Sequence, residues 1–461
     1  MATDAVATAP VAADDDWHIV IKARHETLDT QTFHVGTRRS ILARKQADEV
    51  VKALREAWPE HNFEIHAMST TGDNNQKTAL HKFNEKALWT QELEVLLEDG
   101  SLDLIVHSLK DMPTQLPMGL SLGCVTQRED ARDALVLKPA LVEKVKTLKD
   151  LPAGAVVGTS SLRRTAQLKR FYPQLQFQDV RGNIGTRLAK LDDPHSDYSA
   201  ICIAVAGLER LGLSHRISSY LSKDNGGMLH AVGQGALGIE IRSDDERTKK
   251  LLSKIGDDRS WRQALVERAL MRTLEGGCSV PIGVETEWIS KSRMHDQHAG
   301  VGIKPAEDYN QLSGEATNAG GTKQLEDEQS DELLMRAIVV SLDGKDAAEI
   351  ETRRRVITHE QAHEFGFDAA RMLVERGADK ILEQGERLAQ ARVLLSQNHY
   401  FSTFAPKASA HQGCQISTLT STWPWRAANK GTSVTWDELT NNWLLFKLSS
   451  SSGLFWNGTM A

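Results

Sequence analysis

An alternation of strand-like and helix-like patterns near the start of the chain is the feature that most constrains its fold. Apolar and polar residues alternate over 33–35 and 63–67, as in half-buried strands. Apolar residues at helical spacing predict helices over 47–58 and 86–97, and the apolar run 104–106 predicts a buried strand. Strands that alternate with helices in this way indicate an α/β fold with a parallel sheet.

A second stretch repeats the same order of elements. Strands are predicted at 155–157, 175–180 and 200–205, with helices at 162–172 and 184–191, and with Ala206-Gly207 ending the last strand. The turns Gly36–Ser40 and Gly158–Arg164 both begin with Gly-Thr and contain paired arginines, so we interpret them as two similar strand-to-helix turns. The glycine-dense segment from Asn225 to Gly235 follows, and such a crossover suits a hinge.

The remaining patterns predict a third, smaller α+β domain. It comprises a helix over 261–274, strands at 280–288 and 333–342, and a long helix over 369–388. Residues 291–331 are rich in Gly, Asn, Gln and acids, which predicts a disordered insert. From 397 onward Ser and Thr become dense and half of the ten tryptophans appear without a sustained period, so we interpret 397–461 as an atypical tail.

The predicted architecture is therefore α/β, with two α/β domains joined by a hinge and a small α+β C-terminal domain. The predicted divisions are a disordered extension at 1–31, a first α/β domain at 32–128 with 229–253, a second at 129–228, and the α+β domain at 254–396 with its insert 291–331.

Composition excludes several classes of protein. With 40% hydrophobic and 25% charged residues, the chain is an ordinary globular protein, and its net charge of −7 means that anions must be bound by local arginine clusters. The four cysteines have no metal-site spacing, which argues against a zinc site and a disulfide scaffold and favours a reducing compartment. Residues 1–16 contain no Lys or Arg and no long apolar core, so we expect a cytoplasmic protein without a membrane span.

Polar residues cluster where the buried strand 104–106 ends. His107, Ser108, Lys110 and Asp111 follow the strand directly, before Pro113 stops any regular structure. In open α/β sheets ligands bind at this edge. The Asp111 carboxylate can stay ionised beside Lys110 and face a cation or a row of N–H donors. On this stretch alone, a solvated turn aspartate is the better interpretation.

Arginines gather at the ends of the predicted strands. They are Arg38, Arg39, Arg163, Arg164, Arg181, Arg187 and Arg210. Arginine binds carboxylates through two parallel hydrogen bonds, and the helix N-termini of these turns also favour anions. A single pair is better explained by a solvated helix face, but the repeated placement favours a cleft for a ligand with several carboxylates.

Other motifs are absent from the sequence. The chain contains no G-x-x-x-x-G-K-[ST], no G-x-G-x-x-G after the first strand and no H-E-x-x-H. Basic residues are not interleaved with aromatic ones in the manner of nucleic-acid binders. We therefore expect no bound nucleotide, metal ion or nucleic acid.

Cys278 lies in a glycine-flanked loop, Glu275–Gly283, after a predicted helix. The C-terminus of a helix does not help a thiol to ionise, so Cys278 is not predicted to be a nucleophile of low pKa. A thiol that anchors a group once has no such requirement. The alternative is a small buried residue, which is a common place for a free cysteine.

Together these residues resemble the hydroxymethylbilane synthase (porphobilinogen deaminase) family over about Phe33 to Leu388. The motifs are His107–Pro113, Gly158–Arg164, Val180–Arg187, Val232–Ala236 and Leu274–Pro281. The resemblance implies that the first two domains are similar to type II periplasmic binding proteins. It also implies that the third domain anchors a dipyrromethane cofactor by a thioether bond to Cys278.

The resemblance further implies the roles of individual residues. Asp111 would be the catalytic carboxylate. The cofactor would contact Lys82, Ser108, Lys110, Asp111, Thr159, Ser160, Ser161, Arg163, Arg164, Arg181, Gly182 and Gln234. The substrate would contact Arg38, Ser40, Arg187 and Arg210.

The implied reaction joins four porphobilinogens head to tail, each losing ammonia, before water releases the linear tetrapyrrole. Loss of ammonia leaves a cation that a carboxylate can stabilise, while the same group relays protons. The substrate is a small molecule, and we expect a monomer. The competing interpretation is a two-lobed receptor or sensor domain for small anions, which would leave Cys278 and the third domain unexplained.

Overall fold

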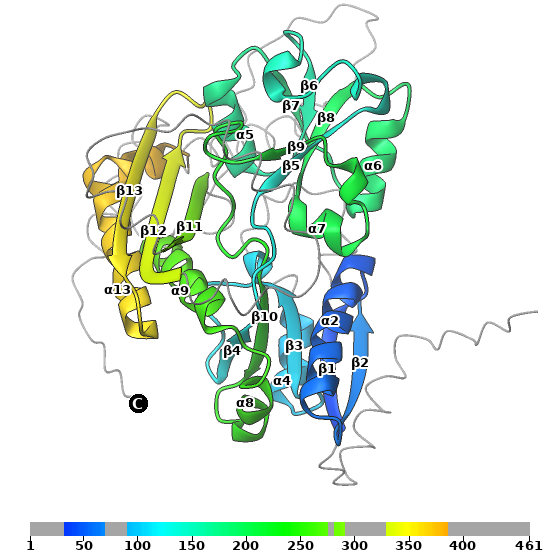
Figure 1. Ribbon diagram of the computed structural model, residues 1–461, viewed down its shortest axis with the longest axis vertical. Coiled ribbons are helices and arrows are strands. Elements are labelled where there is room, and N and C mark those ends of the chain that lie inside the picture. The colour runs from blue at the N-terminus through cyan, green and yellow to red at the C-terminus, as the bar shows by residue number, and fades with distance from the viewer. Residues whose placement is uncertain (1–31, 70–89, 275–280, 291–328, 386–461) are drawn as a thin grey trace, which may run out of the picture. The chain divides into compact units, whose positions relative to one another are not determined.

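The computed structural model describes residues 32–69, 90–274, 281–290 and 329–385 (Figure 1). These residues form two five-stranded sheets and one three-stranded sheet, with helices between the strands. The predicted extension 1–31, the tail 397–461 and residues 291–328 of the predicted insert lie outside the described residues. The predicted α/β class with a small α+β part is confirmed.

The first sheet has the strand order β2-β1-β3-β10-β4. Its strands are β1 (Thr32–Arg38), β2 (Asn62–Met68), β3 (Leu104–Ser108), β4 (Leu120–Val125) and β10 (Leu237–Arg242). β1 is parallel to β2 and to β3, as predicted, but β10 is antiparallel to β3 and β4. Leu237 pairs with Ser108, so β10 begins where β3 ends and runs back along it. The sheet is therefore mixed, which local periodicity cannot reveal.

The helices of the first sheet are α2 (Ile41–Ala57), α4 (Gln91–Glu98) and α8 (Glu246–Leu252). The apolar face predicted for α2 is confirmed, since Val50, Val51 and Leu54 are buried in the core with Phe33 of β1. The helix begins six residues before the predicted start, because the Ser40 side chain accepts a hydrogen bond from the Ala43 N–H and caps it.

The second sheet has the order β7-β6-β8-β5-β9 and is again mixed. Its strands are β5 (Asp133–Leu137), β6 (Val156–Gly158), β7 (Gln176–Gln178), β8 (Tyr198–Ala204) and β9 (Ser219–Leu221). Its helices are α5 (Leu162–Phe171), α6 (Ile184–Asp192) and α7 (Val205–Arg210), and the short 3₁₀ turns are η5 (Pro139–Leu141), η6 (Leu148–Asp150) and η7 (Ser214–Arg216).

Two predictions in this region were wrong in detail. The strand predicted over 175–180 is only the three-residue β7. The pair Ala206-Gly207 does not end a strand, because α7 begins at Val205 and contains both residues. A Cβ at Gly207 would lie 2.9 Å from Ile184 of α6, so this glycine permits close packing of the two helices.

The third sheet is antiparallel, and Figure 1 shows it beside α9 and α13. Its strands are β11 (Ile282–Ser290), β12 (Gln329–Val340) and β13 (Ala347–Arg355), and its helices are α9 (Asp258–Thr273) and α13 (His359–Glu375). Val266 and Leu270 of α9 share a core with Phe365 and Leu373 of α13.

Three sequence predictions for the third sheet need correction. Residues 329–331, assigned to the insert, belong to β12. β13 was missed because charged residues dominate it, although Ala348 and Ile350 face the core. The helix predicted over 369–388 begins earlier, as α13 capped by Thr358, and is interrupted by a turn at Gly377 with φ +89°, after which residues 378–385 are again helical. Among the described residues, no helix combines the length and apolarity needed to cross a bilayer.

Candidate functional site

The predicted polar cluster lies at the end of strand β3, at the edge of the first sheet. The 3₁₀ turn η4 (Leu109–Asp111) follows this strand directly. Asp111 and Ser108 line a cavity together with Arg38 and Ser40, which come from the turn between β1 and α2. Within the described residues the exposed Asp111 carboxylate has no hydrogen bond. The structure thus brings four of the predicted site residues to one cavity.

Buried polar contacts hold this edge in place. His107 Nε2 lies 2.8 Å from the Glu240 carboxylate of β10, and both side chains are buried. The Ser108 hydroxyl is bonded to the Gln46 side chain of α2 at 2.8 Å. Arg268 of α9 donates to the Pro113 carbonyl at 2.6 Å. Sequence reasoning missed Glu240, Gln46 and Arg268. A charged residue inside an apolar strand, as at Glu240, was the available signal.

The backbone conformation around Gln234 requires glycine at positions 233 and 235. Gly233 has φ +72°, and a Cβ there would lie 3.2 Å from the backbone nitrogen of Lys110. Gly235 has φ +89° and lies against the backbone of Glu129. Side chains at both positions would be strained, and a side chain at Gly233 would displace the turn that carries Asp111. Gly233 therefore allows the return segment to pack against η4, and Gly235 allows it to pack against the backbone of Glu129.

The paired arginines at the start of α5 meet a buried carboxylate. Arg163 and Arg164 lie 2.8 Å and 2.7 Å from opposite oxygens of Asp133, the first residue of β5. Gln234 donates to Asp133 Oδ1 at 2.9 Å. Arg164 also donates to the Cys202 carbonyl at 2.9 Å, so all three of its nitrogens are engaged. Asp133 was not predicted, because nothing local marks it as their partner.

The charges around Asp133 shift its pKa. Burial alone would raise the pKa of this carboxyl, but the two guanidinium groups outweigh burial and hold the pKa well below its usual range. Asp133 is therefore ionised in the fold at neutral pH. It neutralises one of the two adjacent positive charges, leaving a net positive group at this place.

The cavity at Asp111 and the arginine group influence one another electrostatically. Burial lowers the pKa of Lys110 to about 8, an effect that Asp111 opposes and Arg164 reinforces. Burial likewise lowers the pKa of Arg187 to about 10, and again Arg164 reinforces the shift while Asp111 opposes it. Charges from the first and second sheets therefore lie close enough to act on one another.

The predicted hydroxyl and glycine positions shape the turns of the second sheet. Ser161 accepts the Arg164 N–H and caps α5, Thr159 accepts the Ser161 N–H at 3.2 Å, and the Ser160 hydroxyl donates to the Val180 carbonyl at 2.8 Å. Gly182 has φ +104°, where a Cβ would contact Thr186. These contacts fix the strand-to-helix turns that carry the arginines.

The other predicted arginines differ in their surroundings. Arg187 donates to the Gly182 carbonyl at 2.8 Å, and Arg181 lies 3.9 Å from Asp179. Arg210 of α7 donates to Glu49 of α2 at 3.0 Å and so links the two α/β units. The predicted residues Lys82 and Cys278 lie outside the described residues.

The described cysteines do not belong to this site. Cys124 and Cys202 are both buried free thiols. Burial raises the pKa of each to about 12, so neither thiol ionises near neutral pH. Among the described residues, therefore, the chemistry available at the site comes from the Asp111 carboxylate and from cations, not from a thiolate.

The fold and the site define a class: an α/β protein in which an exposed carboxylate and an arginine line one cavity and further cations lie within electrostatic range. The comparisons give the family. Residues 33–250 match the model described as "Porphobilinogen deaminase, dipyromethane cofactor binding domain", and residues 261–295 match "Porphobilinogen deaminase, C-terminal domain".

Full-length relatives agree with the family models. The chain is 45% identical to porphobilinogen deaminase of Neurospora crassa, covering 77% of this chain and 94% of that protein. It is 47% identical to the Yarrowia lipolytica protein, covering 76% and 92% of the two chains. A solved structure, the methionine binding protein MetQ, matches 52% of this chain and 96% of that chain, with 15% identity and a TM-score of 0.32. The relatives and the family models place the chain in the porphobilinogen deaminase family, a transferase family of tetrapyrrole biosynthesis, as predicted.

Proposed function

We propose that the chain condenses four porphobilinogen molecules, head to tail and with loss of ammonia, onto a covalently bound dipyrromethane cofactor, and then releases the linear tetrapyrrole hydroxymethylbilane by hydrolysis. Family membership over nearly the whole length of its relatives supports this reaction. The observation that carries it is the cavity in which Asp111 and Ser108 meet Arg38 and Ser40 at the carboxyl end of β3.

The residues present fit an anionic cofactor with pyrrole N–H groups. The Gln234 Oε1 atom is buried and has no hydrogen-bond partner in the described part of the chain, so it can accept an N–H. The nearby cations suit carboxylates. We assign cofactor contacts to Lys82, Ser108, Lys110, Asp111, Thr159, Ser160, Ser161, Arg163, Arg164, Arg181, Gly182 and Gln234, and the thioether anchor to Cys278. When bound, this group supplies the pyrrole end that accepts the first substrate.

Asp111 is the proposed catalytic residue. When the substrate loses ammonia it becomes cationic, and a fixed carboxylate stabilises that charge. In its protonated form the same group can protonate the leaving amine, and the carboxylate that this leaves can then stabilise the cation and accept the proton from the coupled carbon. Its exposure in the cavity suits this role, because Asp111 must contact a ligand and is not committed to a hydrogen bond within the described residues.

The arginines divide into two kinds in this proposal. Arg164 has all three nitrogens engaged by Asp133 and the Cys202 carbonyl, so it acts mainly by maintaining positive potential. Among the described residues, the contacts of Arg163 run through one terminal nitrogen, to Asp133 and to the Leu229 carbonyl, which leaves donors for a ligand carboxylate. Arg38, Ser40, Arg187 and Arg210 bind substrate, with Arg210 exchanging its partner Glu49 for a substrate carboxylate.

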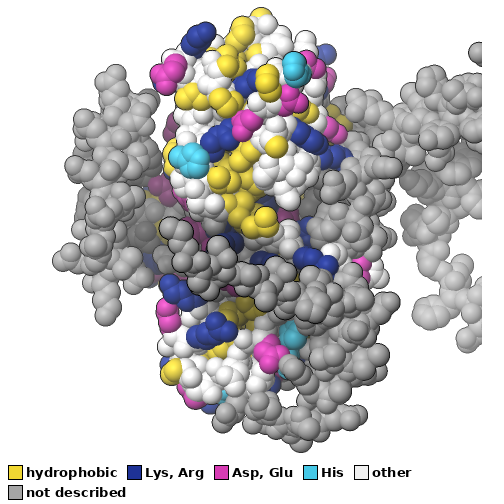
Figure 2. Space-filling model, turned by 90° about the vertical axis from the view of Figure 1, so that its right-hand side faces the viewer, with side chains coloured by type: hydrophobic (Ala, Val, Ile, Leu, Met, Phe, Trp, Pro, Cys, Tyr) yellow, Lys and Arg dark blue, Asp and Glu magenta, His cyan; other side chains and the backbone are white. Residues whose placement is uncertain are grey.

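The other parts of the proposal concern the whole chain. We divide it at the predicted boundaries, 32–128 with 229–253, 129–228 and 254–396, and the membership of the three sheets supports this proposal. We propose a cytoplasmic monomer that binds no nucleic acid. Among the described side chains visible in Figure 2, basic and acidic groups are interspersed and form no continuous basic stripe of the kind that binds nucleic acid.

The intact mass of the purified chain tests the proposal. The synthase carries an additional dipyrromethane, whereas a receptor for small anions has the mass of its sequence. Cys278→Ala should abolish the added mass and the turnover of porphobilinogen. Its melting temperature should fall, since a ligand bound only by the native state stabilises that state.

Cys124→Ala is the matched control, because Cys124 is buried in the first sheet and lies outside the proposed site. This variant should keep the added mass. An unchanged mass in Cys278→Ala, apart from the substitution itself, would refute the anchor. Absence of the added mass and of porphobilinogen turnover in the wild type would refute the reaction.

A further inference from the structure

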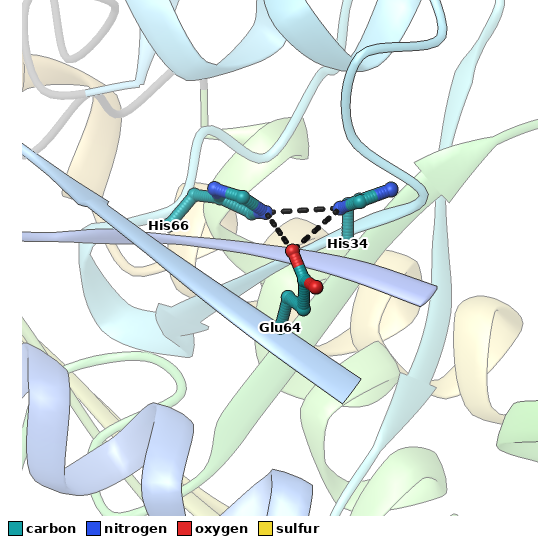
Figure 3. Close-up of side chains that lie close together, drawn as sticks. All are labelled: His34, Glu64 and His66. Atoms are coloured by element: carbon teal, nitrogen blue, oxygen red, sulfur yellow. Dashed lines mark hydrogen bonds and ion pairs between the residues drawn. The ribbon is translucent and has the colours of Figure 1, made fainter. Parts of the chain in front are cut away.

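Three side chains that could hold a metal ion stand together on the first sheet, outside the cavity at Asp111. His34 lies on β1, and Glu64 and His66 lie on β2 (Figure 3). The two strands are parallel and in register, with His34 opposite Glu64 and with His66 two residues further along the same face. The neighbouring residues Phe33, Val35 and Phe63 are buried in the core that α2 covers, so the three side chains occupy the opposite face.

The three ligand atoms form a compact triangle. His34 Nδ1 lies 2.9 Å from His66 Nε2. The Glu64 Oε2 atom lies 3.9 Å from His34 Nδ1 and 4.0 Å from His66 Nε2. The imidazole nitrogens are close enough that only one proton fits between them. At least one nitrogen therefore presents a lone pair, which is the form that binds metals.

We propose that His34, Glu64 and His66 bind one divalent transition-metal ion of the zinc class. Zinc–ligand bonds of about 2.0–2.1 Å at tetrahedral angles place ligand atoms about 3.3–3.4 Å apart. The observed separations of 2.9, 3.9 and 4.0 Å bracket this value. Side-chain shifts of about half an ångström would thus give three equal ligands, and water would complete the tetrahedron.

The donor set selects the ion. Two imidazoles and one carboxylate suit Zn²⁺, Co²⁺, Ni²⁺ and Cu²⁺, whereas Mg²⁺ and Ca²⁺ require mostly oxygen ligands. Strand pairing fixes all three backbone positions, and the His34 N–H also donates to the Asp103 carboxylate at 2.7 Å. The site is therefore built on a rigid scaffold. Its ligands come from positions 34, 64 and 66, so no local motif in the sequence could reveal it.

The site is separate from the catalytic machinery. None of its residues lines the cavity that contains Asp111. A bound ion would join β1 to β2 and so stabilise the edge of the first sheet. Metal binding should consequently raise the melting temperature of the cofactor-loaded enzyme and leave the turnover of porphobilinogen unchanged.

The test uses the full cofactor-loaded chain, from which metal is first removed with a chelator. This protein is then titrated with Zn²⁺ and, separately, with Co²⁺. Calorimetry with Zn²⁺ counts the ions bound, and Co²⁺ absorption in the visible reports tetrahedral coordination. The chain has further histidines outside the described residues, so the quantity of interest is the difference between wild type and variants. His66→Gln and Glu64→Gln should each bind one fewer Zn²⁺ or bind it more than about tenfold more weakly, since even residues behind the ligands affect affinity by that factor.

Glu64→Gln keeps the proposal testable if a histidine variant fails to fold, because the Glu64 side chain is 42% exposed and its removal disturbs no core. His195→Gln is the matched control, as His195 is exposed on the second unit. The control should bind zinc like the wild type, and Mg²⁺ in large excess should not compete. Equal zinc binding by wild type, Glu64→Gln and His66→Gln would overturn the proposal, and so would a wild type that binds no zinc.

Discussion

Asp111 and Asp133 are two carboxylates at the ends of strands, and both act on Lys110, yet their surroundings are opposite. Asp111 is exposed and lines a cavity. Asp133 is 0% exposed and is bound by Arg163, Arg164 and Gln234. A carboxylate whose partners lie within the protein stabilises the fold, whereas one that faces a cavity can act on a ligand. The same residue type therefore supports stability at one position and, in our proposal, chemistry at the other.

The comparison also changes how the arginines are interpreted. The sequence suggested that Arg163 and Arg164 were equivalent ligands for carboxylates. In the structure Asp133 occupies some of the hydrogen-bond donors of both arginines, and all three nitrogens of Arg164 are engaged within the protein. Internal pairing with one acid leaves one net positive charge on the group. A local arginine cluster can thus attract an anionic ligand without every member touching it.

Removing the buried acid should produce the largest effect. Asp133→Ala leaves two buried guanidinium groups facing each other, and losing one partner of a buried pair costs about 3–5 kcal/mol of the free energy of unfolding. The control is Asp192→Ala, which breaks an exposed pair with Arg216 worth about 0–1 kcal/mol. Urea unfolding of both variants measures the difference. Equal, small losses would contradict the structural role of Asp133.

The contribution of Asp133 to stability should also appear as a loss of stability at low pH. The pKa of Asp133 in the fold lies below its ordinary value of 3.8, so its stabilisation is complete above that value. It is lost progressively as the pH falls from 3.8 toward the lower pKa of the folded state. The stability of Asp133→Ala should therefore depend less on pH below about 4 than that of the wild type.

Asp111→Asn should show the converse behaviour, with catalysis lost and stability kept. Removing one preorganised electrostatic group typically lowers kcat by about 10²–10³. Asp111→Glu restores the charge with a displacement of one methylene, so we expect partial activity. Tetrapyrrole release measures the rate, and intact mass confirms that cofactor is attached. An Asn variant that carries cofactor and turns over at the wild-type rate would remove Asp111 from the mechanism.

Variants of Arg181 and Arg164 should distinguish an effect on ligand binding from an effect on folding. Arg181→Ala should cost about 1.5–3 kcal/mol of ligand binding through loss of a charge-assisted contact. Arg164→Ala should weaken ligand binding through loss of positive potential, because all three nitrogens of Arg164 are engaged within the protein. Arg164→Ala should also lower the free energy of unfolding, because it breaks the pair with Asp133. Lys should restore function poorly at both positions, since an ammonium group cannot form two parallel bonds. Full restoration by Lys at both would indicate general electrostatics instead of specific recognition.

The charge of Lys110 should have the smallest effect, and only the pH dependence of stability and of KM should show it. Its pKa of about 8 lies below the ordinary 10.5, so the folded chain releases this proton first and its stability rises between about pH 8 and 10.5. If only the charged form holds ligand carboxylates, KM should rise about tenfold between pH 7 and pH 9. Lys110→Arg should flatten this profile.

The exposed Lys52→Arg serves as the control and should leave the pH profile unchanged. A wild-type KM that stays constant from pH 7 to pH 9 would show that the charge of Lys110 does not contribute to ligand binding.

The local patterns of the chain were sufficient for most of its helices and for several strands. α5 and α6 were predicted within one residue of their observed ends, because their apolar spacing and their polar N-terminal turns agree. The start of α2 and the division after α13 were missed, since a capping serine and a glycine of positive φ decided them. β13 was missed because its charged outward face hides the alternation that buries Ala348 and Ile350.

The sequence by itself determined the alternation of strands and helices, the family motifs, and the placement of Asp111 directly after a buried strand, because these are relations between neighbouring residues. Tertiary structure alone decided that β10 lies antiparallel between β3 and β4, that Asp133 pairs with arginines about 30 residues away, and that His34 meets His66 across two strands. Periodicity reports which face of an element is buried. It carries no information about which distant side chain packs opposite that face, and the pairing of Asp133 with its arginines and of His34 with His66 depends on that packing.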